Sequence, residues 1–346
     1  MSPRLSVLDL VPVRSDQTSA HAVGAAVHLA RVADDLGYER YWVAEHHNMP
    51  AVAATNPPVL IAMLAGATER LRVGSGGVML PNHAPLVIAE QFALLEAAYP
   101  GRIDLGIGRA PGTDPATSWA LRHGAGGVSD DNVTHFPEYV DNVLAMMEPS
   151  GVGLQLRGSV HTLTATPAAT TVPTIWLLGS SDYSARLAAE KGIPYVFAHH
   201  FSGRGTAAAL ELYRSTFQAS EHLAQPQTFL TVNASVAETA EEALRLATPQ
   251  LQMMLALRSG LPLSAQRLVE EAEKHECSAE QQDLMAAMAR RWVIGDAEGA
   301  RTQVRDLAST YGVDEVMIHP VAGAWVGTDP ASAPAREQTL RLLADW

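Results

Sequence analysis

Cysteine is almost missing from the chain. Cys277 is the single cysteine among 346 residues, which excludes an intrachain disulfide and any zinc site built from cysteines. The sequence also lacks a basic start followed by an apolar run, and no apolar stretch reaches the roughly 18 residues that a membrane span needs. We therefore expect no export signal, no membrane anchor and a cytoplasmic location.

Positive charge is also scarce. The 24 basic residues against 37 acidic ones leave a formal net charge of −13, and lysine and arginine form no cluster. We therefore expect no nucleic-acid or membrane partner. A hydrophobic content of 47% with 18% charged residues is typical of a globular protein.

Two common motifs are missing as well. No HExxH pair is present, and a metal site would need such convergent ligands, so we expect no metal. No GxGxxG fingerprint follows the first predicted strand, so we expect no resident nicotinamide site. Electrons would then have to come from a separate reductase or from transiently bound NAD(P)H.

The most informative stretch that is present runs from residue 72 to residue 114. Its first segment, Arg72–Leu80, mixes β-branched residues with glycines and stops before Pro81, which predicts a buried strand. The adjacent Gly76 and Gly77 let a flat ligand approach the main chain closely. A simple bulge is the alternative interpretation.

An arginine follows the next predicted strand. Leu86–Ala98 carries apolar residues at helical spacing, and Arg102–Ile107 predicts a second strand that leads directly to Arg109. Loops at the carboxyl ends of parallel strands build active sites. A guanidinium placed there can bind two phosphate oxygens. A surface ion pair is the alternative for an arginine taken alone.

These segments resemble the bacterial-luciferase-like flavin monooxygenases. The resemblance is carried by GSGGVMLPNHAPLVIAEQ and PGRIDLGIGRAPG in this stretch, by YWVAEHHN from Tyr41 to Asn48, and by WLLGSS from Trp176 to Ser181. All four segments follow the family's order within residues 5–200. The resemblance implies a TIM (β/α)8 barrel and a homodimer, and it is closer to the FMN branch, with its single-chain antibiotic- and polyketide-tailoring members, than to the F420 branch.

The alternation of predicted strands and helices also favours a parallel sheet, and eight strands favour a closed barrel over an open sheet. We treat residues 1–346 as a single barrel domain. We expect one insertion after the fourth strand and a second before the fifth strand, where Leu154–Pro173 should contain a hairpin. A third insertion, of helices within Thr239–Arg291, should follow the seventh strand. This helical insertion could form a lid or only add packing. The predicted strands are Leu5–Leu10, Tyr41–Ala44, Arg72–Leu80, Arg102–Ile107, Thr174–Leu178, Tyr195–Ala198, Phe229–Ala234 and Glu315–Ile318.

Glu45, His46 and His47 lie where the second predicted strand ends, so they should face the mouth of the barrel. Neighbouring side chains on an extended segment point opposite ways, so only one of the two histidines can easily face the centre. The resemblance assigns catalysis to His46, and an unperturbed pKa of roughly 6.5 suits proton transfer. Glu45 and His47 are expected to support it through hydrogen bonds. A histidine that only fixes the loop is the alternative, and His83 could add a polar contact or lie on the surface.

The resemblance places the flavin phosphate between Arg109 and the start of the helix after the fifth strand. Ser181 and Ser184 match the family's hydroxyl positions there, Ser180 is expected to bind the cofactor beside them, and the amino end of a helix favours an anion. Ser181 or Asp182 could instead be only a helix cap. A carboxylate at Asp182 would repel a phosphate unless it turned away.

We therefore expect a flavin-dependent monooxygenase that takes reduced FMN from a separate flavin reductase and uses O2. The resemblance implies that it oxygenates a hydrophobic aldehyde or aromatic polyketide through a flavin C4a-hydroperoxide, with a cis peptide at Gly76–Gly77 beneath the flavin ring. Met49, Val52 and Trp119 could line the substrate pocket or belong to the core. Two alternatives stay open, namely hydride transfer with F420 and a non-catalytic flavin-binding protein.

Overall fold

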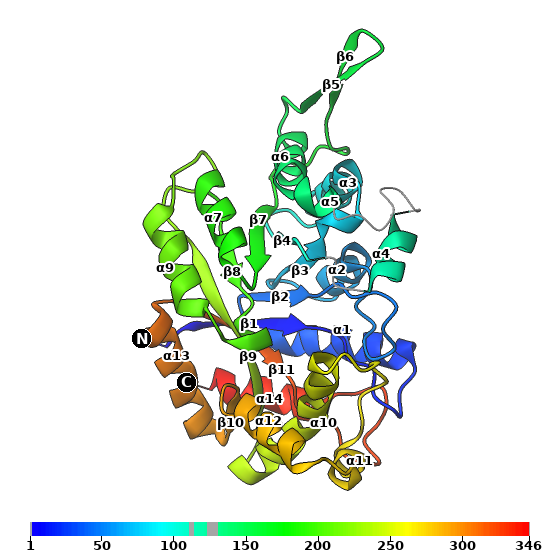
Figure 1. Ribbon diagram of the computed structural model, residues 1–346, viewed down its shortest axis with the longest axis vertical. Helices are drawn as coiled ribbons and strands as arrows, with labels where there is room; N and C mark the ends of the chain where they lie inside the picture. Colours follow the sequence, from blue (N-terminus) through cyan, green and yellow to red (C-terminus); the bar gives the residue numbers. More distant parts are fainter. Residues whose placement is uncertain (1, 111–113, 123–130, 346) are drawn as a thin grey trace.

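Parallel strands close into a barrel in the computed structural model, which describes residues 2–110, 114–122 and 131–345 (Figure 1). Neighbouring strands follow the order β11-β1-β2-β3-β4-β7-β8-β9, and β9 pairs with both β8 and β11, which closes the ring. The predicted TIM barrel is confirmed. The barrel strands are β1 (Arg4–Asp9), β2 (Arg40–Val43), β3 (Arg72–Met79), β4 (Ile103–Gly108), β7 (Thr174–Gly179), β8 (Tyr195–Phe197), β9 (Thr228–Val236) and β11 (Glu315–Pro320).

Helices cover the outside of the barrel and pack on the outward side chains of its strands. These outer helices are α1 (Ser19–Asp35), α2 (Pro57–Gly66), α3 (Pro85–Ala98), α6 (Phe136–Met147), α7 (Asp182–Lys191), α9 (Thr206–Thr216), α13 (Ala297–Tyr311) and α14 (Pro334–Ala344). Thr18 caps α1, Asn56 caps α2 and Asp296 caps α13, so short polar residues define where these helices begin. Within the described ranges, no helix has the length and apolarity to cross a membrane.

Two elements between the seventh and eighth barrel strands differ from the prediction. β10 (Val293–Gly295) pairs with the end of β9, and three residues are too few to show a period. The helix α13 was missed although Ala300, Val304 and Ala308 recur every four residues on its buried face. The remaining short elements are η1 (Leu80–Asn82), α4 (Pro115–Leu121), α5 (Asp131–Thr134) and α8 (His199–Ser202).

A buried charge network fills the amino end of the barrel. Arg40 donates to Glu315 at 2.7 Å and to Asp104 at 2.8 Å, and all three side chains are almost fully buried. Arg72 also donates to Asp104, at 2.5 Å, and the Ser6 hydroxyl donates to Glu315 at 2.6 Å. A buried charge is costly unless it is paired. Each member of the network therefore needs the others.

Large aromatic side chains form the next layer of the interior. Trp42, Trp176 and Phe229 pack with ring centres 5.0–5.6 Å apart in edge-to-face or tilted arrangements. The Arg40 guanidinium lies 5.1 Å from the centre of the Trp176 ring, and the Trp42 indole donates to Asp104 at 3.0 Å. The interior is packed up to this aromatic layer, so the carboxyl end of the barrel, here called the mouth, is the place for a ligand.

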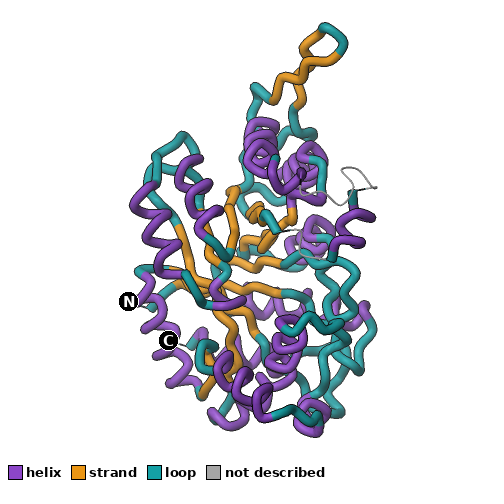
Figure 2. Tube along the Cα trace, in the orientation of Figure 1, coloured by secondary structure: helices purple, strands orange, loops and turns teal. Residues whose placement is uncertain are grey.

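Both insertions around the fifth and seventh barrel strands are present. The hairpin of β5 (Val152–Leu156) and β6 (Ser159–Leu163) projects beyond the barrel (Figure 2). The helices that follow β9 pack against one another, with Leu255 and Met288 in an apolar cluster that also contains Val321. These helices are α10 (Ala240–Arg258), α11 (Val269–Lys274) and α12 (Ala279–Ala289).

Backbone hydrogen bonds join this helical insertion to the loops that follow β1 and β2. The Val13 amide donates to the Ala51 carbonyl at 2.9 Å, and the Gln266 amide donates to the Val13 carbonyl at 2.7 Å. The Ser15 amide donates in turn to the Gln266 carbonyl at 2.8 Å. These three segments form a continuous rim along one side of the mouth.

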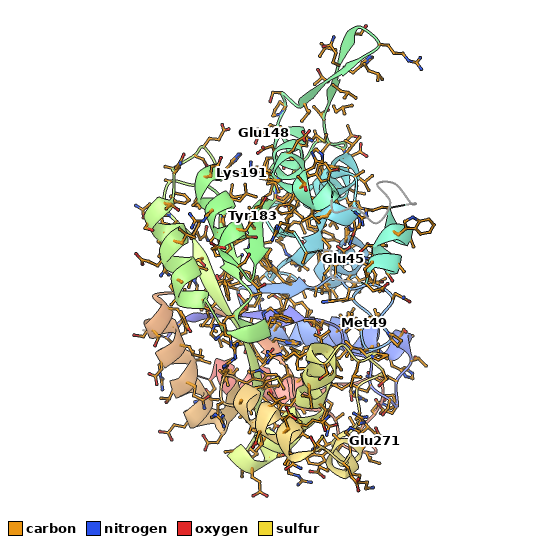
Figure 3. The ribbon with its side chains drawn as sticks, in the orientation of Figure 1. Glu45, Met49, Glu148, Tyr183, Lys191 and Glu271 are labelled. Carbon is orange, nitrogen blue, oxygen red and sulfur yellow. The ribbon has the colours of Figure 1, made fainter. Side chains whose placement is uncertain are left out.

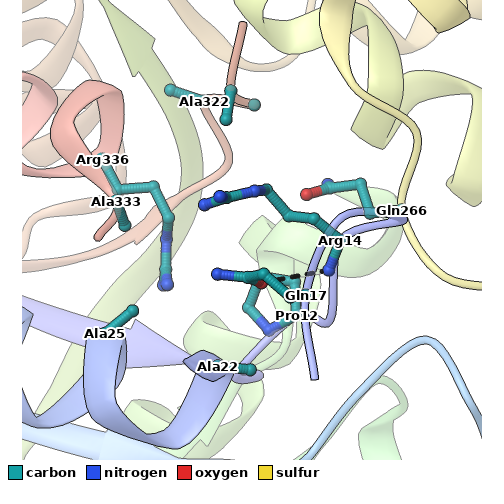
Figure 4. A pocket seen from close by; sticks show the side chains of 11 residues that line it. Pro12, Arg14, Gln17, Ala22, Ala25, Gln266, Ala322, Ala333 and Arg336 are labelled. Atoms are coloured by element: carbon teal, nitrogen blue, oxygen red, sulfur yellow. Dashed lines mark hydrogen bonds between the residues drawn. The ribbon is translucent and has the colours of Figure 1, made fainter. Parts of the chain in front are cut away.

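A small polar cavity lies beside the rim (Figure 4). Arg14 and Arg336 both line it, and Gln17 accepts a hydrogen bond from the Arg14 amide at 3.1 Å. Each guanidinium is already paired, since Arg14 bonds Asp16 at 2.9 Å and Arg336 bonds Asp9 at 2.5 Å. The volume of about 20 Å³ is that of a single water site. The two arginines therefore stabilise the rim.

Replacing Asp104 tests the buried charge network. Asp104→Ala removes a carboxylate that binds both Arg40 and Arg72, so we expect the free energy of unfolding, measured by urea denaturation, to fall by about 3–5 kcal/mol. Glu273→Ala removes only the exposed partner of Arg245 and should leave the urea midpoint unchanged. Equal midpoints for the two variants would contradict the importance of the network.

Candidate active site

Glu45 ties the ends of β2 and β3 together at the mouth. Its carboxylate accepts hydrogen bonds from His47 Nε2 at 2.7 Å, from His83 Nε2 at 2.6 Å and from the Met79 amide at 2.9 Å. Burial alone would raise the pKa of Glu45, but the bonds from both histidines and from the amide lower it to about 2. Glu45 is therefore an anion that positions two loops, and His83 is one of its partners.

His46 does not share the hydrogen bonds of Glu45. Its amide donates to the Ala54 carbonyl at 2.9 Å. Its ring is close enough to His200 and His319 for a charge on it to lower the pKa of both. Burial lowers the pKa of His46 despite the nearby Glu45 carboxylate. Its Nδ1 is buried without a hydrogen-bond partner among the residues described. A neutral imidazole with an uncommitted nitrogen is thus available at the mouth.

The peptide bond between Gly76 and Gly77 is cis, as the resemblance implies. A β carbon on Gly76 would lie 2.9 Å from the Leu8 side chain, and one on Gly77 would lie 2.8 Å from the Gly106 carbonyl oxygen. A side chain at position 77 would collide with backbone, so only glycine fits there, whereas the close contact at position 76 is with the flexible end of a side chain. The register between β3 and β4 also shifts here, so the bulge considered as the alternative is present as well.

Arg109 lies at the end of β4, beside the start of α7 after the paired strand β7. Its guanidinium is 4.1 Å from the centre of the Tyr183 ring, a cation–π contact that holds the side chain against the first turn of α7. Figure 3 labels Tyr183 on this helix. Within the described parts of the chain, no carboxylate pairs with Arg109, so the surface ion pair is not seen there. Pro111 and Gly112 of the same motif lie outside the described residues.

The amino end of α7 lacks a side-chain cap. Ser181 occupies the capping position, but its hydroxyl makes no capping hydrogen bond, so the alternative role of a simple cap is not realised. Asp182 forms an exposed ion pair one turn further along the helix. Ser184 is buried, and a β carbon on Gly179 would lie 2.5 Å from its hydroxyl oxygen. Ser180 and Ser181 are exposed.

Two further histidines at the mouth were missed by the sequence analysis. His200 lies in α8 directly after β8, and His319 lies on β11. His319 Nδ1 is 2.8 Å from Asn233 Oδ1, and His200 Nδ1 is 2.9 Å from Thr231 Oγ1. His319 follows the interior residue Met317 by two positions, so strand alternation counted from the aromatic layer could have found it.

Burial keeps these histidines neutral. It lowers the pKa of His200 to about 4, with further contributions from His199 and His46. It also holds the pKa of His319 well below its ordinary value, with contributions from His200 and Arg336. Three neutral imidazoles, those of His46, His200 and His319, therefore lie close to one another at the mouth.

Glu45, His47 and His83 have ligand atoms within 4.8 Å of one another, which is the spacing of a metal site. The carboxylate oxygen, however, lies only 2.7 Å and 2.6 Å from the two ring nitrogens. Ligands at about 2.1 Å from a tetrahedral zinc would be about 3.4 Å apart. The observed spacing is therefore that of hydrogen bonds around an anion.

The three apolar residues considered for a substrate pocket have different surroundings. Val52 is 9% exposed and packs within the loop after β2, whereas Met49 of the same loop is partly exposed (Figure 3). Trp119 on α4 is 52% exposed. Val52 is therefore part of the packed rim, and Met49 and Trp119 present apolar surface.

Comparison with known proteins identifies the family. The model of the luciferase-like monooxygenase family matches residues 4–315. The chain belongs to this family. A relative from Escherichia coli (strain K12), named luciferase-like monooxygenase, is 38% identical over 314 residues, which are 91% of this chain and 90% of the relative. The crystal structure of apo-MsnO8 is 32% identical, has a TM-score of 0.83, and matches over 99% of this chain and 98% of that one.

Two more distant solved structures share the fold. The oxygenating constituent of 3,6-diketocamphane monooxygenase from Pseudomonas putida, solved with FMN, is 17% identical with a TM-score of 0.70, over 100% of this chain and 98% of that chain. The coenzyme F420-dependent tetrahydromethanopterin reductase from Methanopyrus kandleri is 14% identical with a TM-score of 0.65, over 99% and 97% of the two chains. Membership of the luciferase-like monooxygenase family supports an oxidoreductase or monooxygenase.

The buried histidines predict that the fold is sensitive to acid. The pKa of His200 is about 4 in the folded chain and 6.5 ordinarily. Between these values the unfolded chain binds the extra proton, so stability falls as the pH falls, by an amount on the order of 3 kcal/mol for one such histidine. We expect His200→Gln to make the fall in the free energy of unfolding less steep between about pH 7 and about pH 5, in urea denaturation.

His222→Gln serves as the control for this comparison, because His222 is exposed. The control variant should keep the slope of the unaltered protein. If the free energy of unfolding of His200→Gln falls with pH as steeply as that of the unaltered protein, then protonation of His200 does not destabilise the folded chain.

Proposed function

We propose that this protein is a flavin-dependent monooxygenase that uses reduced FMN and O2 to oxygenate a hydrophobic organic substrate. When bound, reduced flavin supplies the electrons and the reactivity toward dioxygen. The chain contributes binding contacts, shielding from water and a neutral imidazole. The observation that carries the proposal is the uncapped start of α7 beside the Arg109 guanidinium.

The phosphate of FMN fits this corner of the mouth. The first N–H groups of a helix and its dipole favour an anion, and a guanidinium can bind two phosphate oxygens. Ser180, Ser181 and Ser184 bring three hydroxyls to the same turn, two of them exposed. The ion pair of Asp182 with Arg186 offsets the charge of the one carboxylate in this turn.

The glycine pair and His46 fit the other end of the cofactor. Gly76 and Gly77 offer the flavin ring a stretch of main chain without side chains. His46 has a ring nitrogen free of other bonds and can hold or transfer a proton beside the ring. Glu45 and His47 support its loop through their hydrogen bond.

The remaining parts of the proposal concern partners and motion. A separate flavin reductase supplies reduced FMN, and two copies of the chain form a homodimer. The substrate is an aldehyde or an aromatic polyketide, in line with the apolar surface of Met49 and Trp119. The insertion with α10, α11 and α12 belongs to the single barrel domain and acts as a lid at the mouth.

A comparison of FMN with riboflavin tests the phosphate contacts. We expect the protein to bind reduced FMN at least about tenfold more tightly than reduced riboflavin, because a charge-assisted hydrogen bond contributes about 1.5–3 kcal/mol. Arg109→Gln should lose most of this preference, whereas Arg31→Gln, at an exposed position on α1, should keep it. Anaerobic fluorescence titration measures the six affinities, for two flavins and three proteins.

Two outcomes would contradict the FMN proposal. If the unaltered protein bound FMN and riboflavin with equal affinity, Arg109 and the start of α7 would not bind the phosphate of FMN. Tighter binding of reduced F420 than of reduced FMN, together with reduction of a substrate by F420, would favour hydride transfer instead.

A second experiment tests His46. The protein with reduced FMN is mixed anaerobically and then exposed to O2, and the visible absorbance of oxidised flavin is followed. We expect this absorbance to return at least about tenfold faster in His46→Ala, because alanine cannot hold or transfer a proton beside the flavin ring. The affinity for FMN should stay the same, and so should the time course of His222→Gln. An unchanged time course in His46→Ala would restrict His46 to fixing its loop.

A further inference from the structure

The hydrogen bonds of Asn233 fix the proton on His319. The amide nitrogen of Asn233 donates to the His200 carbonyl at 2.8 Å, so its amide oxygen is the atom 2.8 Å from His319 Nδ1. An amide oxygen only accepts hydrogen bonds, so Nδ1 of His319 carries the proton and Nε2 is a bare acceptor. Among the residues that the structure describes, this Nε2 has no hydrogen-bond partner.

The tautomer of His200 depends on the Thr231 hydroxyl, which lies 2.9 Å from His200 Nδ1 and 3.2 Å from the Phe197 carbonyl. The carbonyl can only accept, so when the hydroxyl donates to it, the hydroxyl oxygen accepts from His200 Nδ1. Nε2 of His200 is then also a bare acceptor, and no described residue bonds to it. Burial lowers the pKa of both rings, so both nitrogens stay unprotonated at neutral pH.

Both rings lie above the aromatic layer, at the mouth. His319 follows Met317 by two positions, and Thr231 follows Phe229 by two positions, and both Met317 and Phe229 belong to the interior cluster. The ring centres of His200 and His319 are 6.2 Å apart, with the planes 78° apart. In the described part of the chain these histidines do not form a three-ligand group within 4.8 Å, so they are not arranged around a metal.

We propose that His200 and His319 form a hydrogen-bond-accepting subsite beside His46, which binds the uncharged hydroxyl group of an aromatic substrate. This proposal rests on the proposed function and narrows its substrate class. An aliphatic aldehyde has no donor hydrogen for a bare Nε2, and a carboxylate would face it with a lone pair. A phenol has both the donor hydrogen and a flat ring that packs against the imidazoles.

Three naphthalene probes test the subsite by equilibrium titration calorimetry. We expect 2-naphthol to bind about threefold to tenfold more tightly than 2-methoxynaphthalene, in which a methyl group replaces the donor hydrogen. We expect 2-naphthoate to bind more weakly than 2-naphthol, because neutral imidazoles do not attract an anion. The titration needs no turnover and is run with and without FMN, so its result is independent of the identity of the cofactor.

Matched variants connect the preference to the two histidines. The double variant His200→Leu/His319→Leu should bind 2-naphthol and its methyl ether equally, whereas His200→Gln/His319→Gln keeps amide oxygens as acceptors and should keep part of the preference. His199→Gln is the control, because His199 is a buried neighbour with its own hydrogen bond to Thr206. It should keep the full preference.

Equal affinities of the unaltered protein for 2-naphthol and its methyl ether would overturn the proposal. Tighter binding of 2-naphthoate would also overturn it, since that result indicates a cationic site. If the leucine variant fails to fold, the nitrogen-15 resonances of the histidine rings in the unaltered protein decide. The resonance of an unprotonated Nε2 should shift with 2-naphthol and not with the ether, and unshifted resonances would refute the subsite.

Discussion

The need to pair one buried guanidinium constrains much of this barrel. Arg40 extends from β2 into the interior and bonds Asp104 of β4 and Glu315 of β11. Since an unpaired charge in this place would be very costly, strands on both sides of β2 are held in a fixed register. The guanidinium also packs against the rings of Trp176 and Phe229. The position of the aromatic layer along the barrel axis therefore depends on Arg40. That layer sets the depth of the mouth.

The polarity of the interior side chains changes along the barrel axis, from the charge network at the amino end to the mouth. The charge network around Arg40 lies at the amino end, and the aromatic layer above it is apolar. The charges at the mouth, such as Glu45 and the pair of Arg336 with Asp9, have partners of their own. The mouth then carries neutral imidazoles at its centre, while the cation of Arg109 and the start of α7 lie to one side. An anionic group is therefore favoured at the side and an uncharged group at the centre, which suits a cofactor with a phosphate tail and an uncharged substrate.

The parts of this structure that depend on local sequence were predictable, and the parts that depend on barrel closure were not. The strands, the hairpin and the glycine pair at Gly76 follow from residue patterns within short stretches, and the position of His46 follows from a motif. His200 and His319 are 119 residues apart in sequence and carry no local signal, so only the closed ring brings them together. His83 likewise gains its role from Glu45 on a neighbouring strand. Strand β10 was missed because three residues show almost no periodicity, and helix α13 was missed although its buried face repeats every four residues.

The attachment of Gln266 to the rim limits how the insertion after β9 can move. Gln266 lies in the linker between α10 and α11, and its backbone is bonded on both sides to the segment after β1. That segment is bonded in turn to the loop that carries His46, through Val13 and Ala51. The linker is therefore fixed to the rim beside the loop of His46. A lid motion of the kind proposed above would have to leave this attachment in place, so the displacement would fall on the parts of α10, α11 and α12 that lie away from Gln266.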